Sequence, residues 1–306
     1  MIRQVHLKLI AAHSLRHAVR GGAGLVSIAL TLLVGLGLAQ CAIGPLEMVN
    51  KDLDRAEKAM ERDGQAISAD QRAAAQEKLN AGVITAAGKA INWAIEPSDS
   101  QLEYLVKEKP AMVSALLVLL FLATPFFACL GGFNQTSGDI GSKGLRFLLL
   151  RTERPNIFIG RFIGTFLFSA CVNLLLFLIL AIYMAAKVKV HSPGDMFLWT
   201  MQGYVRMMIF TLPYIALCAW ISSAIDSPFL SLFASLMLVY LIPIFIGIAS
   251  SSESAISYGQ YITPWGFKYW LLEPLGPKFF GGIAAMLGFT GLFMWMGLSG
   301  FGKRDL

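Results

Sequence analysis

Long apolar stretches alternate with shorter polar segments along this chain of 306 residues. A helix that crosses a hydrocarbon core of roughly 30 Å needs about 20 mostly apolar residues, because every backbone N–H and C=O must be satisfied within the segment. Six stretches meet this requirement: 21–44, 111–133, 157–186, 207–225, 228–250 and 279–302. The pattern predicts an all-α integral membrane protein with six transmembrane helices.

Composition supports a membrane protein over a water-soluble one. Hydrophobic residues make up 56% of the chain and charged residues 14%, with a mean hydropathy of +0.63, whereas an ordinary soluble domain carries roughly a quarter charged residues. The first apolar stretch follows a basic leader, as in a signal peptide, but no small-residue cleavage motif precedes a soluble mature chain. We therefore expect that stretch to be an uncleaved transmembrane helix.

The distribution of positive charge predicts the orientation. With the N-terminus inside, the cytoplasmic pieces are 1–20, 134–156, 226–227 and 303–306, and together with Arg161 they carry eleven lysine and arginine residues. The short outer segments 187–206 and 251–278 carry five. Cytoplasmic loops carry the excess of lysine and arginine. We expect both termini inside, in a bacterial inner (cytoplasmic) membrane.

The 45–110 segment is the one sizeable hydrophilic region and is predicted to be an extracytoplasmic helical hairpin. A helix over 46–63 ends at Gly64, and a second helix, capped by Ser68 or Asp70, runs to about Ile95. One face of the second helix repeats apolar residues at near-helical spacing: Leu79, Val83, Ala87 and Ile91. That face should pack on the first helix, on membrane-facing loops or on a periplasmic protein, and the sequence leaves these open.

Residues 1–20 form a basic segment in which Leu9 and Ala12 fall near one helical face. Such a segment is typical of an interfacial helix that contacts membrane lipid. A plain positively charged flank on the inner side explains the same charges, so both interpretations stay open.

The outer segment 251–278 concentrates aromatic residues between prolines. The residues of interest are Tyr261, Trp265, Tyr269 and Trp270. Aromatic side chains with a polar tip settle at the headgroup level of the membrane, which favours an interfacial belt. A re-entrant element that forms the outer gate of a translocation path is the alternative, since irregular backbone at membrane depth must be buried in protein.

Several kinds of chemistry have no counterpart in the sequence. Arg161 and Arg206 fall at the ends of predicted spans and no charge lies deep in one, which disfavours an ion-coupled carrier. The glycine-rich run 297–303 places Arg304 where a phosphate-binding loop needs Ser or Thr. Four cysteines, Cys41, Cys129, Cys171 and Cys218, lie within or beside apolar spans, so neither a disulfide framework nor a metal site is predicted. We expect no catalytic site, no cofactor and no nucleic-acid partner.

The loop 134–156 carries the strongest functional signal. A glycine-rich turn with Asp139 leads to a short helix, in which Leu145, Leu148 and Leu149 are predicted to form an apolar ridge for a partner's groove. Three arginines, Arg146, Arg151 and Arg154, are predicted to stay solvated. Two glycines four residues apart, Gly160 and Gly164, open the next span and suggest close helix packing.

This loop resembles the ABC-2 type permease family, in which such a region meets the ATPase. An acidic, glycine-containing turn, a Leu-Arg-x-Leu-Leu segment, an arginine and a Gly-Arg pair entering a helix fit that pattern: Asp139, Leu145, Arg146, Leu148, Leu149, Arg154, Gly160 and Arg161. The chain departs from it at Gly141, where a second acid is often found, and at Lys143-Gly144, which replaces the usual Gly-Thr.

The resemblance implies a permease subunit of an exporter. Its expected partners are a second copy or a paralogue and cytoplasmic ABC ATPase subunits. The 134–156 loop would couple it to the ATPase. Two other classes remain: an ion-coupled secondary carrier, and a non-transporting scaffold whose 45–110 hairpin recruits a periplasmic partner. The arginines are also compatible with simple inner-side anchors, and the leucines with an interfacial helix. No residue indicates the substrate.

Overall fold

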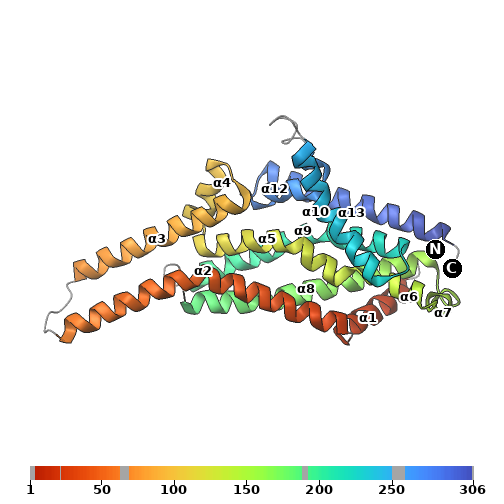
Figure 1. Ribbon diagram of the computed structural model, residues 1–306, viewed down its shortest axis with the longest axis horizontal. Coiled ribbons are helices and arrows are strands. Elements are labelled where there is room, and N and C mark those ends of the chain that lie inside the picture. The colour runs from red at the N-terminus through yellow and green to blue at the C-terminus, as the bar shows by residue number, and fades with distance from the viewer. Residues whose placement is uncertain (1–3, 21, 63–68, 188–191, 250–258, 305–306) are drawn as a thin grey trace. The chain divides into compact units, whose positions relative to one another are not determined.

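The structure, a computed structural model, describes residues 4–20, 22–62, 69–187, 192–249 and 259–304 (Figure 1). All regular structure in these ranges is helical, and none of it is strand. The elements are α1 (Gln4–Arg20), α2 (Gly22–Arg62), α3 (Ala69–Ile95), α4 (Asp99–Glu103), the π-helix η1 (Tyr104–Glu108), α5 (Ala111–Gly132), α6 (Ser137–Gly141), α7 (Leu145–Leu149), α8 (Arg154–Lys187), α9 (Pro193–Ala224), α10 (Pro228–Ala249), the 3₁₀ turns η2 (Gln260–Ile262) and η3 (Pro264–Phe267), α12 (Lys268–Leu272) and α13 (Pro277–Lys303).

Six helices among the described residues are long and apolar enough to cross a membrane. They lie in α2, α5, α8, α9, α10 and α13. The prediction of an all-α protein with six membrane-length helices is therefore confirmed. The inner or outer position of their ends stays a prediction.

Two helices extend beyond the bounds predicted for the membrane spans. The span 21–44 and the helix expected from Leu46 form one continuous helix, α2, because the polar residues that follow the apolar stretch are mostly good helix formers. Likewise, much of the predicted loop 187–206 is helical, since α9 begins at Pro193. Ser192 caps this start: its hydroxyl accepts a hydrogen bond from the Asp195 backbone N–H at 3.1 Å and donates to the Asp195 carboxylate at 2.7 Å.

The second helix of the predicted hairpin, α3, buries one face. Val83, Ala87 and Ile91 are all buried, which confirms the helical spacing of these three positions, while Trp93 is 78% exposed. The predicted break at Gly64 lies outside the described residues.

Contacts divide the chain into two compact units. One comprises 1–31, 123–175 and 205–306, and the other comprises 32–122 and 176–204.

Trp199 forms part of the core of the second unit. Its indole N–H donates to the Ser114 hydroxyl at 3.0 Å, and its ring meets Tyr104 edge-on at 5.9 Å. The ammonium of Lys109 lies over both rings. Because the indole N–H has its partner, this large aromatic side chain is buried without an unsatisfied donor.

Candidate functional site

A buried hydroxyl of α9 contributes to holding the turn between α5 and α6, within the first unit. Ser222 Oγ accepts hydrogen bonds from the backbone N–H groups of Thr136 and Ser137 at 2.9 and 3.0 Å, and all three residues are buried. Buried N–H groups need such partners. The sequence analysis missed Ser222 because one serine in an apolar span carries no pattern.

Asp139 in α6 forms an ion pair with Arg161 in α8. The same guanidinium donates to the Gln135 backbone carbonyl. The structure therefore brings together two of the residues on which the family resemblance rests, and it uses them to attach the α5–α6 turn to the next long helix.

Gly141, one of the departures from the family pattern, lies against the connection between α9 and α10. A Cβ at this position would be 2.6 Å from the Asp226 carbonyl oxygen. Because a backbone atom cannot move as a flexible side chain can, glycine is the residue that this close approach permits.

The predicted apolar ridge on α7 is wrong for Leu145. That side chain is 1% exposed and packs in a core with Ile157, Phe158, Ala219 and Phe301, which belong to α8, α9 and α13. Leu148 and Leu149 are partly buried against the same core. These three leucines attach α7 to the long helices.

The exposed apolar side chains of this segment are two that the sequence analysis did not select. Phe147 is 75% exposed and Leu150 is 84% exposed. They flank Leu148 and Leu149 in the chain and lie on the side of α7 that the core does not use. This exposed apolar pair makes the outer side of α7 the candidate interaction surface of the segment.

The arginines of the segment have two different roles. The side chains of Arg146 and Arg151 are exposed, as predicted. Arg154, in contrast, donates to the backbone carbonyls of Phe301, Gly302 and Arg304 at 3.3, 2.8 and 2.7 Å. The last carbonyls of a helix lack partners within it and carry partial negative charge, so Arg154 caps α13.

Arg304 repeats this arrangement on α9. Its guanidinium donates to the Ser223 carbonyl at 2.6 Å and forms an ion pair with Asp226. Arg154 and Arg304 together connect the start of α8 to the ends of α13 and α9. The number of basic residues in the sequence could not show that these two arginines bind other helices and are not solvated.

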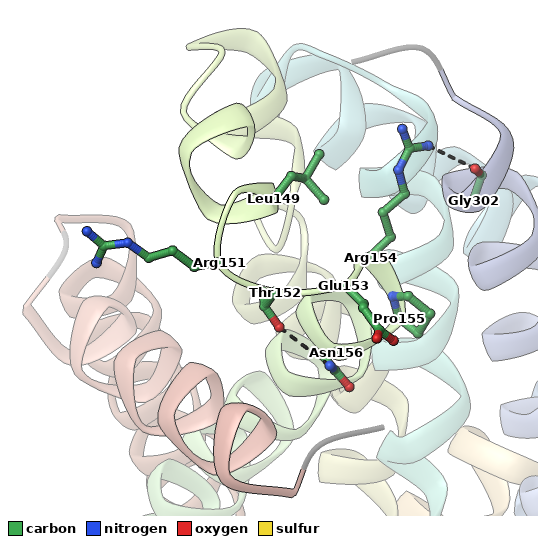
Figure 2. Close-up of a pocket in the computed structure, with 8 residues that line it drawn as sticks. All are labelled: Leu149, Arg151, Thr152, Glu153, Arg154, Pro155, Asn156 and Gly302. Carbon is green, nitrogen blue, oxygen red and sulfur yellow. Dashed lines mark hydrogen bonds between the residues drawn. The ribbon is translucent and has the colours of Figure 1, made fainter. Parts of the chain in front are cut away.

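An open pocket of about 750 Å³ lies beside α7 (Figure 2). Its lining consists of Leu149, Arg151, Thr152, Glu153, Arg154, Pro155, Asn156 and Gly302. Figure 2 shows Arg151 directed away from the guanidinium of Arg154, which faces Gly302. The Asn156 side-chain amide donates to the Thr152 hydroxyl at 3.4 Å, and its buried carbonyl oxygen has no hydrogen-bond partner among the described residues.

Gly160 and Gly164 lie against α1. A Cβ at Gly164 would be 2.7 Å from Ser14 Cβ and 2.8 Å from the Ala11 carbonyl oxygen, and one at Gly160 would be 2.8 Å from Ile10 Cγ2. The two glycines allow α1 to lie directly on α8, as small residues four apart do in close helix pairs. Leu9 and Ala12 are exposed and lie outside this contact.

The four aromatic residues predicted for an outer gate lie in η2, η3 and α12. Tyr261 and Trp270 have ring centroids 5.9 Å apart, and Trp265 lies 6.5 Å from Tyr240 of α10. The Lys268 ammonium lies 4.7 Å from the Trp265 ring centroid and 4.2 Å from that of Tyr269. Burial lowers the pKa of Lys268 to about 8. An interfacial belt and a gate remain the two interpretations.

Arg206, which borders the predicted span 207–225, lies within a longer helix. Because α9 begins at Pro193, Arg206 lies well inside it, and it is buried. Its guanidinium donates to the carbonyls of Leu271 and Glu273 at 2.9 and 3.0 Å and lies over the Phe279 ring. Arg206 therefore caps the end of α12. Because an arginine side chain stays protonated, it cannot serve as a proton relay.

Six helices among the described residues are long enough to cross a membrane, and a short helix with two exposed apolar side chains beside it packs on α8, α9 and α13. These features define a multi-pass membrane protein with a candidate docking element. The model of the ABC-2 family transporter proteins matches residues 9–306, and the chain belongs to this family. The resemblance predicted from residues 139–161 is confirmed. No curated protein matches the chain. The family is a membrane component of transporters that is not catalytic by itself, and membership implies association with an ABC ATPase.

Proposed function

We propose that this chain is the permease subunit of an ATP-driven exporter and that the α6–α7 segment binds a separate cytoplasmic ATPase. The observation that carries the proposal is the two-sided character of α7. Leu145 is fixed in a core shared by α8, α9 and α13, while Phe147 and Leu150 are exposed on the opposite side. A partner that engages the exposed side would act on three membrane-length helices through one rigid element.

Coupling requires the ATPase to hold α7 differently in its two nucleotide states, because a ligand shifts an equilibrium only by its difference in affinity for the two conformations. Movement of the α6–α7 segment would reach α8 through Leu145 of α7 and through the ion pair between Asp139 of α6 and Arg161. It would reach α13 through Arg154. A second copy or a paralogue would complete the translocation path, and α1, held on Gly160 and Gly164, would move with α8.

Co-purification from the native host, in mild detergent, tests the proposal. The wild-type chain should retain a nucleotide-binding ATPase, identified by mass spectrometry, and Phe147→Ser combined with Leu150→Ser should lose it. Substituting Leu148 and Leu149 by aspartate is a poorer probe, because these residues contact the core. The exposed positions can become serine without opening a cavity.

Trp93→Ser is the matched control, since Trp93 is as exposed as Phe147 and lies in α3, the predicted outer hairpin. It should retain the ATPase. If a folded wild-type chain recovers no ATPase, or if the double variant retains it fully, the proposed coupling segment is wrong.

A further inference from the structure

Two buried cysteine side chains meet between α5 and α9 within the first unit. The Cys218 thiol donates to the Cys129 sulfur across 3.7 Å, and both side chains are fully buried free thiols. They are 89 residues apart in the chain, so their spacing in the sequence could not reveal the contact. We propose that this thiol pair is a redox modification site, at which a peroxide converts the two thiols into a disulfide that joins α5 to α9. Such a site is independent of the proposed transport function.

The sulfur contact depends on a close approach of the two helices. Gly132 follows Cys129 by about one turn of α5, and a Cβ at this glycine would be 3.0 Å from Cys218 Cβ and 3.6 Å from Cys218 Sγ. Small residues let two helix backbones approach closely. The absence of a side chain at Gly132 therefore lets the two sulfurs meet.

Hydrogen bonds hold α9 against the end of α5 on both sides of Cys218. On one side, Gln135 Nε2 donates to the Ile215 carbonyl at 3.2 Å. On the other side, Ser222 Oγ accepts from the two buried N–H groups of the α5–α6 turn. Ile215, Cys218 and Ser222 are spaced three and four residues apart, which places them on one face of α9. These bonds fix the register in which the two sulfurs face each other.

The two sulfurs need only a small movement to form a bond. The S–S bond of a disulfide is about 2.05 Å long, so a separation of 3.7 Å has to close by about 1.7 Å. Rotation about the Cα–Cβ bonds moves the sulfurs without moving the helices. The resulting bond would restrain α5 against α9 near the turn that leads to α6.

Oxidation of the pair by hydrogen peroxide balances without a further reactant. The sulfur of one thiol attacks a peroxide oxygen: an S–O bond forms, the O–O bond breaks, and the released hydroxide takes the thiol proton and leaves as water. The second sulfur then attacks the sulfenic acid: the S–S bond forms, the S–O bond breaks, and the second thiol proton leaves in another water. Together the two thiols lose two electrons, and the peroxide is reduced to two waters.

The exposed cysteines, Cys41 of α2 and Cys171 of α8, provide an internal comparison. Susceptibility to oxidation ordinarily follows exposure and thiolate character, which favours these two residues over the buried pair. A buried sulfenic acid, however, has a second thiol beside it. Hydrogen peroxide is small and uncharged, so it can enter a site that excludes larger reagents. Disulfide formation at the buried pair would therefore result from the proximity of the two sulfurs.

The test uses the full chain in detergent with Cys41→Ser and Cys171→Ser, which leaves Cys129 and Cys218 as its only cysteines. After treatment with hydrogen peroxide and then catalase, the chain is denatured in SDS and its thiols are labelled with PEG-maleimide. Untreated chain should take two labels and treated chain none, and dithiothreitol should restore both. Peptide mass spectrometry should find the two cysteine peptides linked. The apparent melting temperature should rise by about 5 °C on oxidation, because the bond closes a long loop.

Cys218→Ser in the same background is the matched control, and Cys218→Ala takes its place if serine prevents folding. Each control is compared with its own untreated sample. Neither should form a disulfide within the chain, and neither should gain in melting temperature. A further control uses the chain with all four cysteines. Oxidised after denaturation it should give several pairings, whereas the folded chain should give the pairing of Cys129 with Cys218.

Three results would overturn the proposal. Two labels on the treated, folded chain would mean that the thiols only pack together. Loss of labels without a linked peptide would mean that the sulfurs oxidise separately. A linked peptide with a lowered melting temperature would mean that the bond forms only after the helices separate. None of these measurements involves an ATPase, so their failure leaves the permease assignment intact, and failure to recover an ATPase leaves the thiol site intact.

Discussion

Gly164→Ala tests whether α1 is held on α8 by the absence of a side chain. The added Cβ would lie 2.7 Å from Ser14 Cβ and 2.8 Å from the Ala11 carbonyl oxygen, whereas ordinary contacts begin near 3.4 Å. α1 would have to move by roughly 0.7 Å, and overpacking of this kind costs about 1–3 kcal/mol. Alanine also forms helix better than glycine by about 1 kcal/mol, which opposes part of that loss.

Gly288→Ala measures the gain in helix propensity without a steric clash, because nothing lies within 4 Å of a Cβ at Gly288 of α13. We expect the apparent melting temperature in detergent to fall for Gly164→Ala relative to Gly288→Ala, by about 2–8 °C on the scaling for large domains. Fluorescence-detected thermal unfolding measures both variants. Equal melting temperatures would show that α1 does not depend on Gly164, and the contact described above would be refuted.

Three further predictions concern the interior of the first unit. Ser222→Ala should cost about 2–4 kcal/mol, because two buried N–H groups lose their acceptor, and hydrogen exchange at Thr136 and Ser137 should accelerate; unchanged exchange would contradict the bonding described. Leu145→Ala should cost about 2–5 kcal/mol, visible in thermal unfolding, whereas a neutral effect would mean that α7 is not anchored there. For Lys268, the pKa falls from 10.5 in the unfolded chain to about 8 on folding. Between these pH values the unfolded chain binds more protons, so the free energy of unfolding should rise with pH, by up to about 3 kcal/mol. Lys268→Met should flatten this rise, and an identical slope in both proteins would contradict the prediction.

The six membrane-length helices could be predicted because a backbone in lipid must form its hydrogen bonds internally. The length of an apolar stretch is therefore nearly sufficient to identify a membrane-length helix. The helix ends could not. Apolar length marks where lipid could surround a helix, whereas propensity and capping decide where the helix begins. At α9 the helix begins at Pro193, capped by Ser192, well before the apolar span predicted from residue 207.

The family resemblance singled out the segment that contains α6 and α7, but the sequence could not show which of its apolar side chains are buried. Leucines at helical spacing predict an apolar face without saying what covers it, and here the ends of α8, α9 and α13 cover Leu145. Phe147 and Leu150 are two positions three residues apart, too short a pattern to show which side of α7 is exposed. The capping role of Arg154 depends on carbonyls about 150 residues away in the chain, which no local pattern contains.

Photo-crosslinking in intact cells tests the central claim most directly. A benzophenone amino acid replaces Phe147 in one chain and Trp93 in another, and the crosslinked products are identified by mass spectrometry. We predict that position 147 captures an ABC ATPase and that position 93 does not. If position 93 captures the ATPase, or if position 147 captures only lipid or another membrane protein, then α7 is not the element through which this chain is driven.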